Sequence, residues 1–311
     1  MKLKFSENPD YQRYEQLLIK TSELIARGEG DSEEADAVRE QMDLPWYRLS
    51  EDEQTRLRGL SGDLYMLQNE EVLQSPLLSF DDFIEQLKEA REWNDWGTML
   101  GILRRRPPRV FKEAAALLRA QAYDGLGHPN PALLFLDFAH RENKSDSGYR
   151  AVRMLMAASA NRFGEIMPEA ELIVRSGGKD VWLIVAAADV MLQWVISLAG
   201  DSKNAALQRI ITALNSQWNA QSHGATPMFL IACAHLIRAV ALWEVGQEEE
   251  ALAALDAAIE VDPGDRFLQK IREDIRRHQT PELGGLSIVQ ALNHRRDLLR
   301  RELQPEPKVA A

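Results

Sequence analysis

The chain has 311 residues, of which 45% are hydrophobic and 27% are charged, so it carries enough apolar side chains to fold and is not disordered as a whole. Its net charge is −11, and residues 1–100 hold 23 acidic against 11 basic side chains. This acidic excess argues against nucleic acid as a partner, because phosphate binding needs dense positive charge.

Residues 1–76 predict an acidic N-terminal helical module. Helices are expected over three ranges, 11–27, 31–42 and 50–68. Ser50 begins the third helix with a capping box, in which its hydroxyl accepts from the backbone N–H of Glu53 and the Glu53 side chain reaches back. Residues 44–47, which include Pro45, are expected to break the second helix, because proline lacks a backbone N–H and clashes with the preceding turn.

From Phe80 onward, the periodicity predicts a succession of helix–turn–helix pairs. The predicted pairs are 80–92 with 95–106, 109–125 with 129–142, 148–163 with 165–176, 180–199 with 203–219, and 227–245 with 247–261. Single helices are expected over 265–278 and 286–302. The chain is therefore expected to be all-α, with four parts: an N-terminal module (1–76), a repeat array (77–264), capping helices (265–302) and a disordered tail (303–311).

One segment of the array is repeated. Residues 116–127 match residues 235–246, because both carry Leu, an aliphatic residue, Arg and Ala in succession and both end in Gly. Beyond the glycine the agreement continues at equal offsets in three pairs: Ala132 and Ala251, Leu136 and Leu255, and Ala139 and Ala258. Glycine can end a helix in the left-handed conformation, alanines let two helices cross closely, and leucines fill the space around the crossing.

This pattern resembles the tetratricopeptide repeat, and the copy ending at Pro263 matches it best. The family has a small residue, a turn glycine, a second small residue, a large apolar residue, an alanine and a closing proline at fixed positions. In this copy these positions hold, in the same order, Ala239, Gly246, Ala251, Leu255, Ala258 and Pro263. The copies around Gly164 and Gly200 depart further from the pattern, and residues 46–60 resemble a segment found ahead of such repeats in bacterial proteins. The resemblance implies an α-solenoid of antiparallel helix pairs that binds peptides in a groove lined by the first helix of each pair.

The groove positions that the resemblance assigns are mostly apolar in this chain. In the two matching copies they include Leu117, Gln121, Asp124, Leu236, Val240 and Trp243. An apolar lining favours a hydrophobic helix or an extended peptide as the ligand. The Lys, Asn and Arg side chains with which some members of the family grip chaperone tails are absent at these positions. The groove could equally be filled by the chain's own terminal helix, residues 286–302.

Five arginines are candidate contacts for carboxylates: Arg104, Arg105, Arg106, Arg119 and Arg238. Arg119 and Arg238 stand at equivalent positions, where the family usually has a large apolar residue. Each either lays its stem on the core and leaves its head in water, or binds a carboxylate. The run 104–106 either stabilises a helix C-terminus or contacts an acidic partner, which includes the chain's own acidic module.

The sequence holds no recognisable pattern of catalytic or cofactor-binding residues. None of the six histidines has His or Cys at metal-ligand spacing, and no dinucleotide-binding, P-loop or nucleophile-elbow motif is present. His235 replaces the tryptophan typical of the repeat and is expected to be packed. The single cysteine, Cys233, excludes an intrachain disulfide and suits a reducing compartment. We expect no metal, no cofactor and no enzymatic activity.

Residues 181–199 are apolar enough to be tested as a membrane span. Asp189 lies at the centre and forms a polar stripe with Gln193 and Ser197, and a central aspartate costs roughly 3 kcal/mol in a bilayer. We therefore expect a buried helix. The leading hypothesis is a cytoplasmic scaffold that binds a protein or peptide. An enzyme on a helical solenoid and a membrane-associated assembly factor are the alternatives, and the partner and the oligomeric state stay open.

Overall fold

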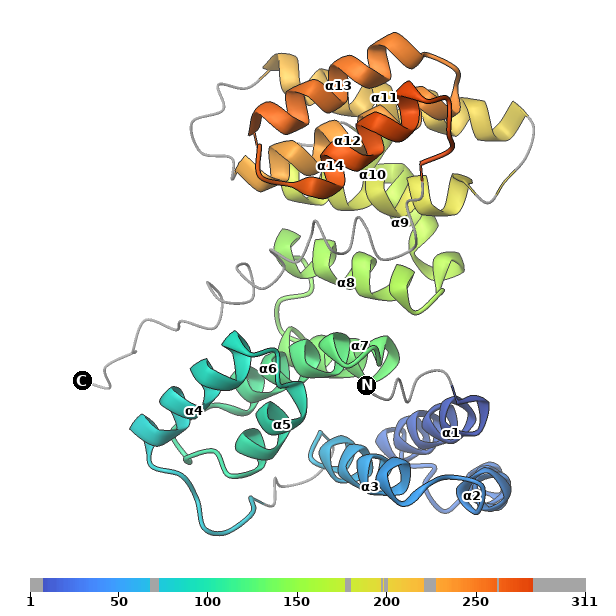
Figure 1. Ribbon diagram of the computed structural model, residues 1–311. Helices are drawn as coiled ribbons and strands as arrows, with labels where there is room; N and C mark the ends of the chain where they lie inside the picture. The colour runs from blue at the N-terminus through green and yellow to red at the C-terminus, as the bar shows by residue number, and fades with distance from the viewer. Residues whose placement is uncertain are drawn as a thin grey trace. The chain divides into compact units, whose positions relative to one another are not determined.

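The structure is a computed structural model that describes residues 8–67, 73–176, 180–196, 198, 201–220, 228–261 and 263–281. Every regular element in these ranges is an α-helix, so the prediction of an all-α chain is confirmed (Figure 1). The chain divides into two compact units, residues 1–141 and residues 142–311. The predicted boundaries at 76 and 264 fall inside these units, while the predicted helix 286–302 and tail 303–311 lie outside the described residues.

The described part of the first unit consists of two groups of helices. Its helices are α1 (Pro9–Ala26), α2 (Glu33–Trp46), α3 (Glu51–Tyr65), α4 (Phe80–Glu92), α5 (Trp96–Arg104), α6 (Lys112–Gly125) and α7 (Pro129–Ala139). In the first group α1 packs against both α2 and α3, and in the second α4, α5, α6 and α7 pack in succession. Each predicted helix of this region is therefore present, and the later helices follow one another as packed neighbours.

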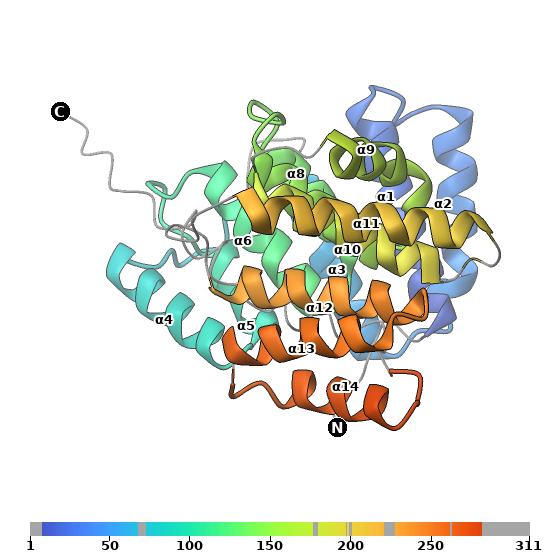
Figure 2. The same cartoon turned by 90° about the horizontal axis from the view of Figure 1, so that it is seen from above.

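The second unit is built around one apolar helix. Its helices are α8 (Ser147–Ser159), α9 (Phe163–Ser176), α10 (Val181–Ile196), α11 (Asp201–Ala220), α12 (Met228–Glu244), α13 (Glu248–Val261) and α14 (Arg266–Arg276). α10 packs against α8, α9, α11 and α12, and α11 to α14 lie side by side in sequence order (Figure 2). A helix with neighbours on several faces has to be apolar all round, which accounts for the composition of α10.

The structure places the apolar stretch 181–199 in this core as far as it is described. Asp189 is 0% exposed and accepts a hydrogen bond of 2.9 Å from Nε2 of Gln193, one turn further along α10. This pair is part of the polar stripe expected from the sequence. In the described part of the chain, no helix combines the length and the apolar character that crossing a bilayer requires.

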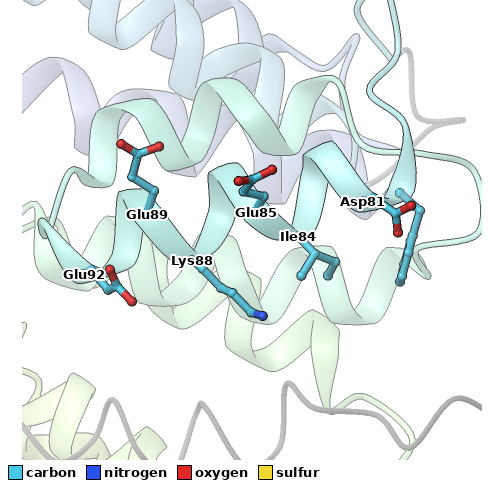
Figure 3. A pocket seen from close by; sticks show the side chains of 7 residues that line it. Asp81, Ile84, Glu85, Lys88, Glu89 and Glu92 are labelled. Atoms are coloured by element: carbon cyan, nitrogen blue, oxygen red, sulfur yellow. The ribbon is translucent and has the colours of Figure 1, made fainter.

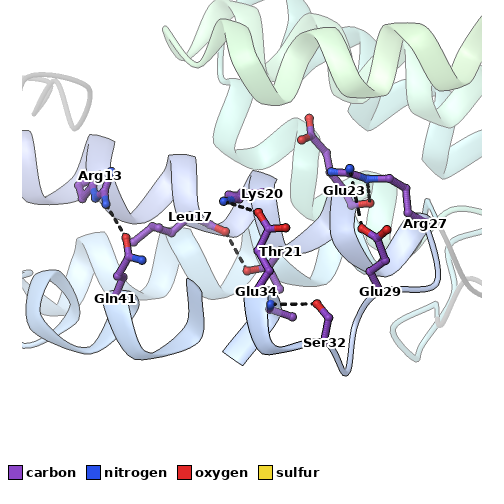
Figure 4. A network of polar contacts seen from close by, with 11 residues as sticks. Arg13, Leu17, Lys20, Thr21, Glu23, Arg27, Glu29, Ser32, Glu34 and Gln41 are labelled. Atoms are coloured by element: carbon purple, nitrogen blue, oxygen red, sulfur yellow. Dashed lines mark hydrogen bonds and ion pairs between the residues drawn. The ribbon is translucent and has the colours of Figure 1, made fainter. Parts of the chain in front are cut away.

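The first two helices form a hairpin with a small apolar core and a polar rim. The core consists of Leu17, Leu24, Ala35 and Val38, with Met42 packed against it. Around it, Arg13 donates to Gln41 at 2.7 Å and Lys20 pairs with Glu34 at 2.7 Å (Figure 4). The hydrogen bond and the charge of Lys20 lower the pKa of Glu34. Such exposed pairs add little to stability, so the apolar core is what holds α1 on α2.

Two details of the first group test the sequence analysis at single residues. The capping box of α3 is confirmed, because Oγ of Ser50 accepts from the backbone N–H of Glu53 at 3.3 Å and the Glu53 carboxylate accepts from the backbone N–H of Ser50 at 2.8 Å. The second helix ends within residues 44–47 as expected, but α2 runs through Pro45 to Trp46 rather than stopping near Met42. A proline in the last turn of a helix removes only its own hydrogen bond, so the helix can include it and then end.

The two matching segments of the sequence adopt the same local structure. Gly127 and Gly246 have φ of 81° and 79°, the left-handed conformation expected of helix-ending glycines. Their N–H groups donate at 2.9 Å to the residues three positions before them, Asp124 and Trp243. The matched small and large apolar side chains are at most 1% exposed: Ala120, Ala239, Ala132, Ala251, Leu136 and Leu255. The pairs α6–α7 and α12–α13 are also the most extensively packed neighbours among the described helices.

Candidate interaction sites

A buried carboxylate on α3 joins the two helix groups of the first unit. Asp63 is 0% exposed, and Arg104 at the end of α5 grips it with two hydrogen bonds, Nε to Oδ1 at 3.0 Å and Nη2 to Oδ2 at 2.7 Å. From α6, the Tyr123 hydroxyl donates to Oδ2 at 2.7 Å, and Nε of Arg119 lies 3.6 Å from Oδ1. This is the bidentate arrangement that guanidinium and carboxylate groups favour, completed by a neutral donor.

The environment of the cluster keeps its donors in their protonated forms. Burial opposes the charge of Arg104, but the hydrogen bonds and charge of Asp63, together with the nearby Tyr123, outweigh burial and raise the pKa of that guanidinium above its ordinary value. Burial, and then the charge of Asp63, raise the pKa of Tyr123 well above its usual range. The ring of Tyr123 is also stacked on Phe135 with centroids 5.4 Å apart, which fixes the direction of the hydroxyl. The cluster is therefore a preorganised carboxylate-binding site.

A second buried polar contact links α1 to the turn between α6 and α7. Nδ1 of His128 lies 2.6 Å from Oε2 of Glu15, and the Tyr11 ring lies 5.4 Å from the imidazole. All three side chains are buried. The backbone N–H of His128 donates at 2.8 Å to the carbonyl of Tyr123, which holds the histidine at the turn. The Asp63 cluster and this pair therefore both include a residue on α6 or in the turn that follows it.

Sequence reasoning did not single out Asp63. The residue continues the apolar stripe of α3, whose other buried side chains are Leu57, Leu60 and Leu64. A carboxylate on an apolar helix face is the signal that could have found it, because buried charges are retained only with partners. The same helix also brings Gly59 close to the site: a Cβ atom added there would stand 2.7 Å from Nη2 of Arg104.

The five arginines proposed as carboxylate contacts have different surroundings. Arg104 and Arg119 meet a carboxylate, and it is the chain's own Asp63 in the acidic N-terminal region. Arg105 donates from Nε to the carbonyl of Pro76 at 3.0 Å. Arg106 is buried and donates to main-chain carbonyls of its own loop.

Arg238, the counterpart of Arg119 in the second unit, meets an amide rather than a carboxylate. Its Nη1 donates to Oδ1 of Asn215 at 3.2 Å, and burial lowers its pKa. Its side chain is partly exposed, whereas that of Arg119 is buried. Equivalent positions in two copies of the repeat therefore hold the same residue in two different environments.

The expected groove residues are mostly covered rather than open. Four of them are at most 6% exposed: Leu117, Gln121, Leu236 and Val240. Asp124 and Trp243 are partly exposed. Among the described residues, neither amide atom of Gln121 has a hydrogen-bond partner. A ligand cannot reach buried side chains without rearrangement, so these positions do not offer an open apolar surface in this structure.

The outer face of α4 offers a surface of a different character. An open hollow runs along this helix, and its described lining comes from α4 alone: Phe80, Asp81, Ile84, Glu85, Lys88, Glu89 and Glu92 (Figure 3). The four acidic side chains and Lys88 are exposed, whereas Phe80 and Ile84 are partly buried. Arg109 lies over the Phe80 ring at 4.1 Å and marks one end of the face. The opposite face of α4 buries Phe83, Leu87 and Ala90 in the unit.

Cys233 and His235 are both buried side chains of the second unit. In the ranges that the structure describes, no three His, Cys, Asp or Glu side chains are grouped to hold a metal ion. Burial, followed by the charges of Asp189 and Asp265, raises the pKa of Cys233 to about 12, so its thiol stays protonated and unreactive at neutral pH. His235 is 8% exposed, in line with the expectation that it is packed.

No protein-family model, curated protein or solved structure matches this chain. The likeness to tetratricopeptide repeats accordingly stays a resemblance of sequence pattern.

Proposed function

We propose that this chain is a non-catalytic scaffold of tetratricopeptide-like helix pairs that binds a basic segment of a partner protein along α4. The repeat part of the proposal is supported by the equivalence of α6–α7 and α12–α13, which share helix-ending glycines and buried alanines. Stacked helix pairs of this kind present extended surfaces and are suited to binding proteins. The structure leads us to move the expected ligand surface from the covered apolar positions to α4.

The observation that carries the binding site is the composition of the α4 face. Asp81, Glu85 and Glu89 follow one another at a spacing of four residues, which places their carboxylates in a row with steps of roughly 6 Å. Glu92 extends the acidic character, and Lys88 is the one basic residue in the described part of the lining. A partner helix with Lys or Arg once per turn would present cations at the same spacing.

Partly buried aromatic and aliphatic side chains accompany the row of carboxylates. Phe80 and Ile84 stand one turn apart on α4 and belong to the same hollow (Figure 3). A ligand that combines apolar and basic residues would bury apolar area there and pair its charges at the rim, the usual arrangement of a protein interface. In the family that the chain resembles, the groove is lined by first helices, and α4 is the first helix of the first predicted pair.

A binding assay with model peptides tests the proposal. The probe is a fluorescently labelled helical peptide of Lys and Leu, and the comparison peptide has Glu in place of every Lys. We expect the basic peptide to bind with a salt-dependent affinity and the acidic peptide to bind at least about tenfold more weakly, because screening weakens contacts between exposed charges.

A charge-reversal variant locates the site. Glu85→Lys/Glu89→Lys should weaken binding of the basic peptide by at least about tenfold, whereas Glu40→Lys on the exposed face of α2 should have little effect. Equal binding by the Glu85→Lys/Glu89→Lys variant and the unchanged protein would exclude α4 as the site. Equal binding of the two peptides would exclude recognition of basic segments.

A further inference from the structure

The two helix groups of the first unit are joined mainly by side-chain contacts. Inside each group, neighbouring helices pack along their lengths, whereas no helix of α1–α3 packs comparably on a helix of α4–α7 in the described residues. Polar contacts bridge the groups at two places, the four-residue cluster around Asp63 and the pair formed by Glu15 and His128.

The binding elements of the Asp63 cluster all belong to the α4–α7 group. Arg104 ends α5, and Arg119 and Tyr123 lie one turn apart on α6. Asp63 supplies only the carboxylate, and Arg104, Arg119 and Tyr123 each donate to it or carry a positive charge. A carboxylate from another chain could make the same bidentate and hydroxyl contacts, because this geometry recognises the functional group rather than the residue that carries it.

The chain that follows α3 is already attached to the α4–α7 group before α4 begins. The backbone N–H of Gln74 donates to the carbonyl of Arg104 at 2.7 Å, and that of Leu78 donates to the carbonyl of Arg105 at 2.8 Å. Arg105 returns a bond from its side chain to the carbonyl of Pro76. These contacts would keep the arginine-bearing end of α5 in place if α1–α3 moved away.

We propose that Arg104, Arg119 and Tyr123 form a binding site for an acidic segment of a partner protein, which Asp63 occupies in the free chain. Replacing one carboxylate by another re-forms the same hydrogen bonds. The exchange therefore avoids leaving the buried Arg119 and the partly exposed Arg104 without a counter-charge, which is the costly alternative. The partner can bind only to molecules in which the α1–α3 group has moved away from the site. Its apparent affinity is therefore the affinity of the open site multiplied by the fraction of molecules in which the site is open.

Removing the internal competitor tests this proposal. The probe is a labelled peptide of Glu and Gly residues, and its binding is measured by fluorescence anisotropy to the full chain and to Asp63→Asn. The substitution keeps the shape of the side chain but removes its charge, so we expect Asp63→Asn to bind the peptide at least about tenfold more tightly than the unchanged protein. The gain should disappear in Asp63→Asn/Arg104→Gln/Arg119→Gln.

A pair of glycine variants provides an independent test if Asp63→Asn does not fold. Gly59→Ala places a methyl group 2.7 Å from Nη2 of Arg104 and disturbs the contact without changing any charge, whereas a Cβ atom at Gly62 on the same helix meets nothing within 4 Å. We expect tighter peptide binding by Gly59→Ala than by Gly62→Ala. Hydrogen exchange should show faster exchange of α3 amides in the Gly59→Ala variant only.

Three results would overturn the proposal. The first is a folded Asp63→Asn variant, judged by circular dichroism and thermal melting, that binds the acidic peptide no better than the unchanged protein. The second is a gain in binding that survives removal of both arginines. The third is equal binding by Gly59→Ala and Gly62→Ala. The site is independent of the α4 face, and the two proposals can fail separately because their probes carry opposite charges.

Discussion

The pairs α6–α7 and α12–α13 show how one local structure can serve two different purposes. Both pairs turn at a glycine with positive φ, and in both the next residue donates to the carbonyl five positions earlier, at 2.8 Å for His128 and 2.9 Å for Gln247. Their arginines differ, however. Arg119 is buried beside Asp63, while Arg238 is partly exposed and bonds to Asn215.

The neighbouring positions of the two copies differ in the same sense. Tyr123 donates to a carboxylate, whereas its counterpart Leu242 is a buried apolar side chain. Gln121 is a buried amide, whereas its counterpart Val240 is fully buried and apolar. At these two positions the first copy carries polar groups where the second is apolar, and one of them, Tyr123, contacts Asp63 together with Arg119. A position in the repeat therefore determines the direction in which its side chain points. The role of that side chain depends on which segment of the chain packs against it.

The largest difference between the copies should appear on replacing the arginines. Arg119→Met should destabilise the first unit by about 2 kcal/mol, because Asp63 loses a buried counter-charge. The loss stays below the roughly 3–5 kcal/mol expected for a buried charge that has lost its only partner, because Arg104 still pairs with Asp63. Arg238→Met should cost less than about 1 kcal/mol, since methionine keeps the packing of the stem. Urea unfolding and hydrogen exchange of α6 and α12 measure both effects, and equal losses would show that the copies are energetically equivalent.

A somewhat smaller effect is expected from the tyrosine of the first copy. Tyr123→Phe keeps the ring stacked on Phe135 but removes the hydrogen bond to Asp63, which should cost about 1.5 kcal/mol, because the acceptor is charged. Tyr47→Phe is the control, since Tyr47 is 83% exposed. Thermal melts of the two variants give the difference. If both melt like the unchanged protein, the hydroxyl does not contribute to holding α3.

The turn glycines should behave alike and so test the shared part of the comparison. Gly127→Ala and Gly246→Ala should each destabilise the chain by about 1 kcal/mol, because an alanine is strained at positive φ. A Cβ atom at Gly246 meets nothing within 4 Å, so backbone strain alone is measured there. Denaturant titration measures the free energy of unfolding of these variants and of Gly127→Asn and Gly246→Asn. The asparagine variants should lose less stability than the alanine variants, because Asn tolerates positive φ better. A cost confined to one glycine would contradict the equivalence of the two turns.

The smallest change should come from making the first copy more like the second. Gln121→Val removes a buried amide that has no hydrogen-bond partner among the described residues, and it should stabilise the first unit by about 0.5–1 kcal/mol. The reverse change, Val240→Gln, should destabilise the second unit, because it buries an amide at an apolar position. Differential scanning calorimetry measures both. A loss of stability in Gln121→Val would indicate that the amide is satisfied in solution.

Much of the fold could be predicted from local patterns. Ser50 and Glu53 form their capping box, and Gly127 and Gly246 end their helices, because these interactions involve residues within one or two turns of each other. The end of α2 lies a few residues later than expected, at Trp46, because the effect of Pro45 depends on whether it falls in the interior or in the last turn of a helix. Boundaries of this kind are weakly specified by propensity.

The candidate sites were less predictable from the sequence, because their residues lie far apart along the chain. Arg104 and Arg119 were selected as carboxylate contacts because of their charge and position, but nothing near them in the sequence identifies Asp63 as the acceptor. Asp63 lies 41 residues before Arg104 and 60 residues before Tyr123. Likewise, Leu117 and Gln121 have the spacing of a groove face, and spacing does not reveal whether another segment covers that face.

The sequence by itself determined the helices, the turns that separate them and the two matching copies, because hydrogen bonds and caps connect residues close together in the chain. Only the tertiary structure decided that Asp63 fills the arginine site, that the expected groove residues are buried, and that the acidic row on α4 faces outward. These outcomes depend on which distant segments pack together. Burial and charge pairing are properties of that packing, and a helical period specifies the face on which a side chain lies but not its neighbour.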